Sequence, residues 1–221
     1  MDSDESSEGG VFMGVVILAS GGIDSFVMSK IIKEQDQKLI PIFIDYGQLS
    51  AKKEWEACKK IFKNQNFPEP KKIDLSGYGK FFLSGITDET KRIYEDAFLP
   101  GRNMLFLLVG AAYAHTIGEK SIAIGLLSEE SHLFPDQTED FVINANFALN
   151  SALGGSFTIL TPLIKFGKKD IIKLAKDYGL NLADTYSCHL GKDRYCGKCV
   201  ACKEIMKSGE AENLPQFKGD K

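Results

Sequence analysis

The sequence has no excess of basic residues and no long apolar run, and both absences restrict what the protein can do. Its 221 residues include 27 Lys and Arg against 30 Asp and Glu, which gives a formal net charge of −3 at pH 7. Broad nucleic-acid binders are usually basic, so nucleic acid is not an expected partner. No apolar run is long enough to span a bilayer, and the first ten residues lack the basic start of a signal peptide. We therefore expect a cytoplasmic protein with no membrane partner.

The sequence also lacks internal repeats and any evident Ser-His-Asp or Cys-His arrangement for nucleophilic catalysis. Its length suits one domain with a small appendage. Residues 1–12 are predicted to be a flexible acidic tail, residues 13–184 the main domain, and residues 185–221 the appendage.

Short apolar runs typical of strands alternate with longer runs typical of helices. This alternation predicts an α/β fold with helices on both faces of a parallel sheet. The expected strands are residues 14–19, 39–45, 71–75, 121–126 and 158–163, and the expected helices are residues 25–34, 51–65, 102–117, 139–153 and 168–179. Residues 76–99 are expected to be irregular. In open parallel sheets the ligand lies at the carboxyl ends of the strands, where polar residues follow here at 20–25, 45–48 and 128–136.

The most informative stretch joins the first strand to the first helix, with the pattern Ser-Gly-Gly-x-Asp-Ser from Ser20 to Ser25. Glycines let the backbone approach a ligand, and the unpaired N–H groups of a first helical turn bind anions. No Gly-Lys-Ser/Thr follows, so this is not a Walker A loop. Asp24 suits an anion site if Mg²⁺ bridges it to a polyphosphate. A plain capped turn is the alternative, and we predict an ATP site with Mg²⁺ that includes Leu18, Ala19, Ser20, Gly21, Gly22, Ile23, Asp24 and Ser25.

Three further groups extend this predicted site. Asp45, Tyr46 and Gln48 end the second strand, either as an ordinary turn or as the adenine side of the pocket. Arg102 opens an apolar helix, where the macrodipole disfavours a cation unless an anion lies nearby, and its guanidinium suits phosphate oxygens. Lys168 opens the last helix in the same way, and we expect both cations to contact pyrophosphate. The predicted catalytic residues are Asp24, Arg102 and Lys168.

Four of the five cysteines lie close together near the C-terminus. In a chain without a secretion signal, this favours metal binding over disulfides. Four thiolates without a redox motif favour one closed, structural Zn²⁺ site, and an iron–sulfur cluster is the alternative. His189 could replace one ligand, although it cannot easily share a metal with its neighbour Cys188. The predicted zinc ligands are Cys188, Cys196, Cys199 and Cys202.

Together these motifs resemble those of the 7-cyano-7-deazaguanine synthases, a family of the N-type ATP pyrophosphatase (PP-loop) superfamily. The likeness runs from Gly14 to about Lys207, and the matching motifs are Ser20–Ser25, Asp45–Gln48, Pro100–Asn103, Lys168 and the cysteine tail. The resemblance implies a Rossmann-like sheet of the adenine nucleotide alpha hydrolase type and a homodimer.

The resemblance also implies an ATP-dependent C–N ligase that releases AMP- or ADP-type products with pyrophosphate or phosphate. One ATP would adenylate 7-carboxy-7-deazaguanine, and ammonia would then give an amide. A second ATP would activate the amide for dehydration to the nitrile preQ0, a precursor of queuosine and archaeosine.

The chain departs from this family at two places. After Gln48 the family usually has Arg-His, whereas this chain has Leu49-Ser50. The family string Tyr-Pro-Asp-Cys-Arg is replaced by Phe134-Pro135-Asp136-Gln137-Thr138 in the region where the deazaguanine is expected to bind. The predicted substrate-binding residues are Asp136, Gln137 and Thr138.

Two other functions stay open on the sequence alone. A paralogous PP-loop enzyme could adenylate another acceptor, for thiolation of tRNA or transfer of a deazaguanine to a macromolecule. A tRNA enzyme would normally need a basic surface, which this acidic chain does not offer. A module that binds ATP without turnover is the second, and the presence of Asp24, Arg102 and Lys168 together argues against it.

Overall fold

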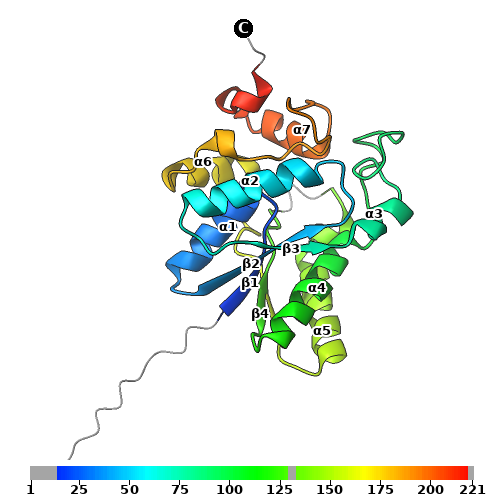
Figure 1. Ribbon diagram of the computed structural model, residues 1–221, viewed down its shortest axis with the longest axis vertical. Helices are drawn as coiled ribbons and strands as arrows, with labels where there is room; N and C mark the ends of the chain where they lie inside the picture. The colour runs from blue at the N-terminus through cyan, green and yellow to red at the C-terminus, as the bar shows by residue number, and fades with distance from the viewer. Residues whose placement is uncertain (1–13, 129–132, 219–221) are drawn as a thin grey trace, which may run out of the picture.

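The computed structural model describes residues 14–128 and 133–218, so the predicted tail over residues 1–12 lies outside the described residues. The described chain contains a five-stranded sheet of order β3-β2-β1-β4-β5 (Figure 1). Each neighbouring pair of strands is parallel, which confirms the predicted α/β fold. The strands are β1 (Gly14–Leu18), β2 (Lys38–Asp45), β3 (Lys71–Asp74), β4 (Ser121–Ala123) and β5 (Thr158–Leu160).

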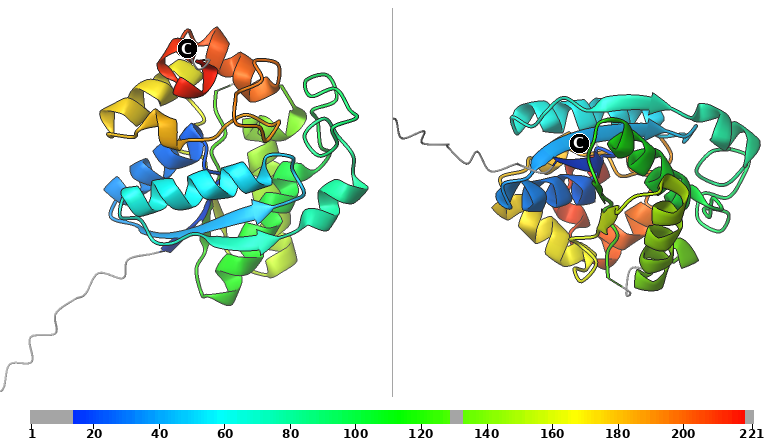
Figure 2. Two further views of the ribbon diagram at one scale, coloured as in Figure 1. Left: turned by 45° about the horizontal axis from the view of Figure 1, so that its top comes forward. Right: turned by 90° about the horizontal axis from the view of Figure 1, so that it is seen from below.

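Helices cover both faces of this sheet because successive side chains of a strand point to opposite sides. Val15 and Ile17 of β1 join the core that contains α1 (Ile23–Glu34), α2 (Ala51–Asn64) and α6 (Lys168–Asp177). Val16 joins the core that contains α4 (Arg102–Thr116) and α5 (Glu139–Leu153). The two layers are visible in Figure 2. The α-helices are α1 (Ile23–Glu34), α2 (Ala51–Asn64), α3 (Ser76–Phe81), α4 (Arg102–Thr116), α5 (Glu139–Leu153), α6 (Lys168–Asp177) and α7 (Val200–Lys207), and the 3₁₀ turns are Pro135–Gln137, Leu182–Asp184, Ala211–Asn213 and Pro215–Phe217.

The structure corrects several of the expected element boundaries. Residues 76–99 are not irregular throughout, because α3 occupies their first six positions. The expected strands at 121–126 and 158–163 end early, at Ala123 and Leu160. Pro162 has no N–H for a strand ladder, which explains why β5 cannot continue through it. Helix α7 is an addition, since its residues were expected only to carry metal ligands.

The C-terminal segment, residues 185–218, contacts the loop at the carboxyl end of β1. The Tyr186 N–H donates to the Gly21 carbonyl oxygen at 3.0 Å, and α7 lies beside α6 (Figure 1). Gly21 has a φ of +76°, and a Cβ there would lie 2.3 Å from the Glu54 carbonyl oxygen. Only glycine fits such a position. The loop after β1 is therefore packed between α2 and the C-terminal segment.

Candidate active site

The loop from Ser20 to Ser25 is shaped by its own serines. The Ser25 hydroxyl accepts a hydrogen bond from the Ser20 N–H at 3.2 Å and donates to the Gly22 carbonyl oxygen at 3.1 Å. Gly22 is the N-cap of α1, and Asp24 lies in the first turn of that helix. Ser25 is buried and maintains the loop, so the N–H groups of the turn are held in a fixed arrangement.

A pocket of about 270 Å³ opens at the carboxyl ends of β1, β2 and β4. It gathers most of the polar residues that the sequence singled out, from five separate segments of the chain. The predicted residues that line it are Leu18, Ala19, Ser20, Gly22, Asp24, Tyr46, Gln48, Arg102, Gln137 and Lys168. The predicted residues outside this lining are Gly21, Ile23, Ser25, Asp45, Asp136 and Thr138.

Lys168 lies at the start of α6 and is held by two carboxylates. Its Nζ donates to both carboxylate oxygens of Asp24, at 2.7 and 2.8 Å, and lies 3.6 Å from Glu204 Oε2. Burial alone would lower the pKa of Lys168, but the charges of Asp24 and Glu204 raise it above its usual value. The lysine therefore stays charged in the pocket, where an anionic ligand can meet it.

Arg102, the first residue of α4, interacts electrostatically with a half-buried acid, Glu54. Glu54 of α2 accepts hydrogen bonds from Gln48 Nε2 at 3.0 Å and from the Ser50 hydroxyl at 2.7 Å. Burial raises the pKa of Glu54, and the Arg102 charge opposes that rise. Burial also raises the pKa of Tyr46 to about 12, so its hydroxyl stays protonated. Tyr46, Gln48, Glu54 and Arg102 thus form one polar wall of the pocket.

Asp45 and two of the three predicted substrate residues are engaged outside the pocket. Asp45 pairs with Lys72 at 2.7 Å. The Asp136 carboxylate accepts from the Asn103 N–H at 3.3 Å, and the Thr138 hydroxyl caps α5 by accepting from the Phe141 N–H at 3.0 Å. These contacts place their side chains in turns beside the pocket rather than in its wall.

Gln137 is the predicted substrate residue that reaches the pocket. Its Oε1 accepts from the backbone N–H groups of Leu133 and Phe134, each at 2.8 Å. The side chain is therefore held in place by its carbonyl oxygen. Its Nε2 can still donate to a ligand, since an amide offers two donors.

Six polar residues line the pocket that were not among the predicted site residues: Glu54, Asn103, Tyr186, Ser187, His189 and Glu204. His189 was considered only as a metal ligand, yet its buried Nδ1 has no hydrogen-bond partner. Burial, reinforced by the Arg102 charge, lowers the pKa of His189 to about 4. A buried polar atom without a hydrogen-bond partner lowers the stability of the fold. A ligand that hydrogen-bonds to Nδ1 would remove this cost. No local pattern marks Glu54 or Glu204, because each depends on contacts between distant segments.

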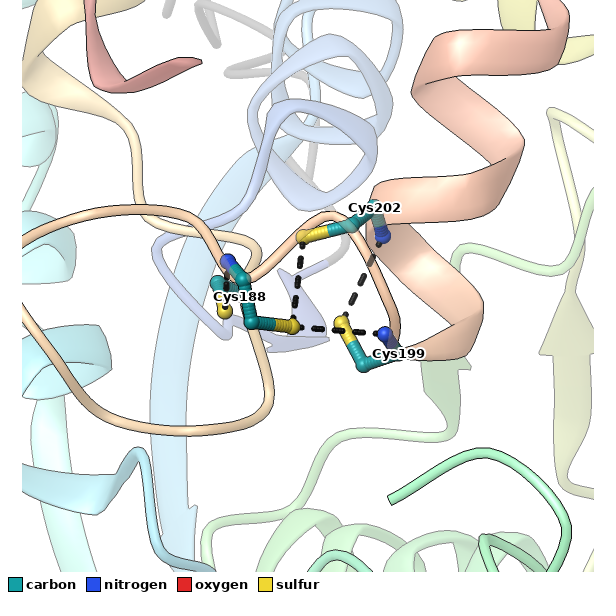
Figure 3. Close-up of side chains that lie close together, drawn as sticks. Cys188, Cys199 and Cys202 are labelled. Atoms are coloured by element: carbon teal, nitrogen blue, oxygen red, sulfur yellow. Dashed lines mark hydrogen bonds between the residues drawn. The ribbon is translucent and has the colours of Figure 1, made fainter. Parts of the chain in front are cut away.

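The four predicted cysteine ligands come together in the C-terminal segment. Their sulfur atoms all lie within 4.8 Å of one another, and the sulfurs of Cys188, Cys199 and Cys202 point toward a common centre in Figure 3. Hydrogen bonds from the thiols of Cys199 and Cys202 lower the pKa of Cys188. A thiolate-rich, closed set of four sulfurs fits a single zinc ion or an iron–sulfur centre. Among the described residues, no other group of His, Cys, Asp and Glu has this arrangement.

Sequence comparison finds one family model and named relatives that cover most of this chain. The family model described as "Queuosine biosynthesis protein QueC" matches residues 14–211. A 7-cyano-7-deazaguanine synthase of Nautilia profundicola is 34% identical over 209 residues, which cover 90% of this chain and 94% of the relative. A protein of the same name from Methanobrevibacter smithii is 31% identical and covers 91% of this chain and 96% of the relative.

Solved structures with low sequence identity share the fold. The NMN synthetase of Francisella tularensis superposes with a TM-score of 0.54 at 14% identity, covering 96% of this chain and 89% of that one. The U34-tRNA thiolase NcsA of Methanococcus maripaludis superposes with a TM-score of 0.52 at 18% identity, covering 93% and 67%. These likenesses support the predicted Rossmann-like α/β fold. Over the residues that the structure describes, none of the helices has the length and apolarity needed to cross a membrane.

Proposed function

The chain belongs to the QueC family of queuosine biosynthesis proteins, and we propose that it converts 7-carboxy-7-deazaguanine and ammonia to 7-cyano-7-deazaguanine with ATP as the activating substrate. One observation supports this most directly: Asp24, Arg102 and Lys168 line a single pocket at the carboxyl ends of the strands. The named relatives and the C-terminal cysteine cluster point to the same family rather than to another PP-loop enzyme.

The reaction needs two rounds of adenylation. A carboxylate oxygen of the acid attacks the α-phosphorus of ATP, and pyrophosphate leaves. Ammonia then attacks the acyl carbon, so AMP leaves with that oxygen and an amide remains. In the second round the amide oxygen attacks another α-phosphorus, and loss of AMP with two protons leaves the nitrile. No step requires a nucleophilic side chain.

The residues of the pocket supply charge and position for these steps. Pyrophosphate carries growing negative charge as it leaves, and fixed cations stabilise that charge in a pocket shielded from water. We assign Lys168 and Arg102 to this task, together with the N–H groups of the loop at Ser20–Ser25. The Asp24 carboxylate fits Mg²⁺, which prefers oxygen ligands and would neutralise phosphate charge when bound.

The remaining walls suit the two organic substrates. The backbone at Tyr46 and Gln48, with the apolar end of β2, is proposed to hold the adenine. Gln137 is proposed to hold the carboxylate of the deazaguanine through its Nε2. Asp136 and Thr138 would then act by maintaining the turn that presents Gln137. The cysteine cluster is proposed to hold one structural Zn²⁺, whose four thiolates leave no open position for catalysis.

Direct assay tests this function. Purified protein, ATP, Mg²⁺, ammonium and 7-carboxy-7-deazaguanine should yield the amide and then the nitrile by mass spectrometry. If no adenylate, amide or nitrile forms, the proposal is wrong. The fold shared with a tRNA thiolase offers only weak support for an RNA acceptor. Salt-sensitive binding of tRNA in a filter assay would favour that alternative instead.

Replacing Gln137 by glutamate should weaken binding of 7-carboxy-7-deazaguanine and leave binding of ATP unchanged. The Glu side chain can still accept from the Leu133 and Phe134 N–H groups, so the turn is retained. It replaces the donor with a negative charge that repels a substrate carboxylate. We expect KM for 7-carboxy-7-deazaguanine to rise by about tenfold or more, with KM for ATP changed by less than about twofold. Thr138→Ser keeps the cap hydroxyl and serves as a control, and an equal rise in both KM values would contradict the assignment.

We propose further that the protein is a homodimer, as the resemblance implies. On α5, Ile143 and Phe147 are 53% and 70% exposed and lie one turn apart, which offers an apolar surface for a second copy. Sedimentation equilibrium should give a mass of twice 24.4 kDa, and Phe147→Glu should weaken the association. A monomer at micromolar concentration would contradict the proposal.

A further inference from the structure

The Asp24 carboxylate, which is proposed to bind Mg²⁺, already pairs with the Lys168 ammonium in the structure. In the structure both oxygens of Asp24 are occupied by the Lys168 ammonium. The side chain of Lys168 is only 11% exposed, so its ammonium is largely withdrawn from water, whereas Asp24 is 31% exposed. If Asp24 binds the Mg²⁺ that accompanies ATP, the cation competes with the Lys168 ammonium for the carboxylate oxygens and weakens this ion pair. A buried ammonium that loses its partner is strongly destabilised.

Glu204 of α7 is the second carboxylate within ion-pair distance of this ammonium. Its Oε2 lies 3.6 Å from Lys168 Nζ, and its side chain is 26% exposed. Among the described residues, Asp24 and Glu204 are the carboxylates that pair with Lys168. Glu204 also lines the pocket. A carboxylate beside an anion-binding loop repels phosphate, so its presence there calls for a compensating role.

We propose that Glu204 is a positioning residue. Its carboxylate keeps the Lys168 ammonium paired, and so in place in the pocket, while the Asp24 carboxylate binds Mg²⁺. The lysine then keeps one carboxylate partner and directs its remaining donors to pyrophosphate. Glu204 acts through Lys168 and touches neither ATP nor the acid. This inference rests on the proposed function, because it takes Asp24 as the group that binds Mg²⁺.

The cysteine cluster determines where Glu204 lies. Cys199 caps α7 by accepting a hydrogen bond from the Cys202 N–H at 3.5 Å, and Glu204 follows Cys202 on the same helix. Val200 and Ala201 of that helix line the pocket as well. The Lys203 ammonium lies 3.2 Å from the centre of the Tyr94 ring, which fixes α7 against the segment after α3. The helix is therefore held from two sides, and its first turns form a wall of the active site.

A matched pair of variants tests the role of Glu204. Glu204→Gln keeps the shape and removes the charge, whereas Glu204→Asp keeps the charge on a shorter side chain. Binding of Mg²⁺ is measured by calorimetry on the intact protein, saturated with a non-hydrolysable ATP analogue. We expect Glu204→Gln to raise the Mg²⁺ concentration at half-saturation by about tenfold, equivalent to about 1.4 kcal/mol. Glu204→Asp should restore part of the affinity, and KM for 7-carboxy-7-deazaguanine should stay unchanged in both variants.

A second variant distinguishes this role from a general electrostatic or structural one. In a Lys168→Met background, Glu204→Gln should change Mg²⁺ affinity by less than about twofold, because the residue acts through the lysine. Glu210→Gln is the control in the same segment, since Glu210 pairs with Lys176 and does not line the pocket. Metal content and circular dichroism verify that each variant is folded.

The outcomes separate the inference from the proposed function. If wild-type protein binds Mg²⁺ with the analogue and Glu204→Gln binds it equally well or more tightly, the role assigned to Glu204 is wrong and the proposed function stands. If Glu204→Gln changes Mg²⁺ affinity equally in the wild-type and Lys168→Met backgrounds, Glu204 does not act through the lysine. If wild-type protein binds no Mg²⁺ with the analogue, the proposed function fails, and the inference fails with it.

Discussion

Asp24→Asn protein is expected to form AMP on the order of 10²–10³ times more slowly than the parent. The substitution keeps the size of the side chain and removes the charge that is proposed to bind Mg²⁺. Asp24 is 31% exposed at the edge of the pocket, so the fold should tolerate the change. Glu204 remains near Lys168 in this variant and limits the loss of charge balance around the lysine. The measurement is AMP release under saturating ATP and acid.

A matched control separates this effect from surface charge. Asp193→Asn also removes a paired carboxylate, but Asp193 is 90% exposed and pairs with Lys53 outside the pocket. The rate of AMP release by Asp193→Asn protein should stay within about twofold of the parent rate. If Asp24→Asn protein turns over as fast as the Asp193→Asn control, the loop does not bind a nucleotide in the proposed way.

Removing the metal is expected to disorder the C-terminal segment and abolish ATP binding together. Structural zinc contributes on the order of 10 kcal/mol to the folding of small domains, and a segment of this size cannot build a sufficient core alone. Its residues Ser187, His189 and Glu204 line the pocket, and the Tyr186 N–H donates to the Gly21 carbonyl oxygen in the loop at Ser20–Ser25. Hydrogen exchange before and after chelation should show loss of protection over residues 185–218 and in the loop at Ser20–Ser25.

Cysteine variants make the same test without a chelator. Cys199→Ser should lower the bound metal well below one equivalent per chain. Cys58→Ala should retain the full equivalent, since Cys58 is buried on α2, away from the cluster, and burial raises the pKa of its thiol to about 12. Elemental analysis distinguishes zinc from iron. A tail that keeps its protection in metal-free protein would contradict a structural metal.

The parts of this site that sequence could predict are those encoded within a few consecutive residues. The loop at Ser20–Ser25 and the four cysteines have spacings that restrict their chemistry. In the structure Ser20, Gly22 and Asp24 of the loop line the pocket, and the four sulfurs lie within 4.8 Å of one another. Arg102 and Lys168 were found because a cation is unfavourable at a helix N-terminus, and each lines the pocket. Alternation of strand-like and helix-like runs was enough to predict a parallel sheet with two covered faces.

What the sequence could not supply depends on contacts between distant segments. Glu54 and Glu204 are ordinary helix residues in the sequence, and only folding brings them to Arg102 and Lys168. The string at Asp136–Thr138 shows the opposite case. Its polarity suggested three ligand contacts, whereas all three side chains accept hydrogen bonds from backbone N–H groups and only Gln137 lines the pocket. A polar side chain can serve a turn as readily as a ligand, and the sequence does not distinguish the two.

Transfer of an oxygen isotope would show whether a carboxylate oxygen of the acid attacks the α-phosphorus of ATP, as proposed. 7-Carboxy-7-deazaguanine labelled with oxygen-18 in both carboxylate positions is incubated with the protein, ATP, Mg²⁺ and ammonium, and the nucleotide products are analysed by mass spectrometry. We expect one labelled oxygen in each AMP, with two labelled AMP molecules for each nitrile. Label in inorganic phosphate beside ADP, or unlabelled AMP, would contradict the proposal.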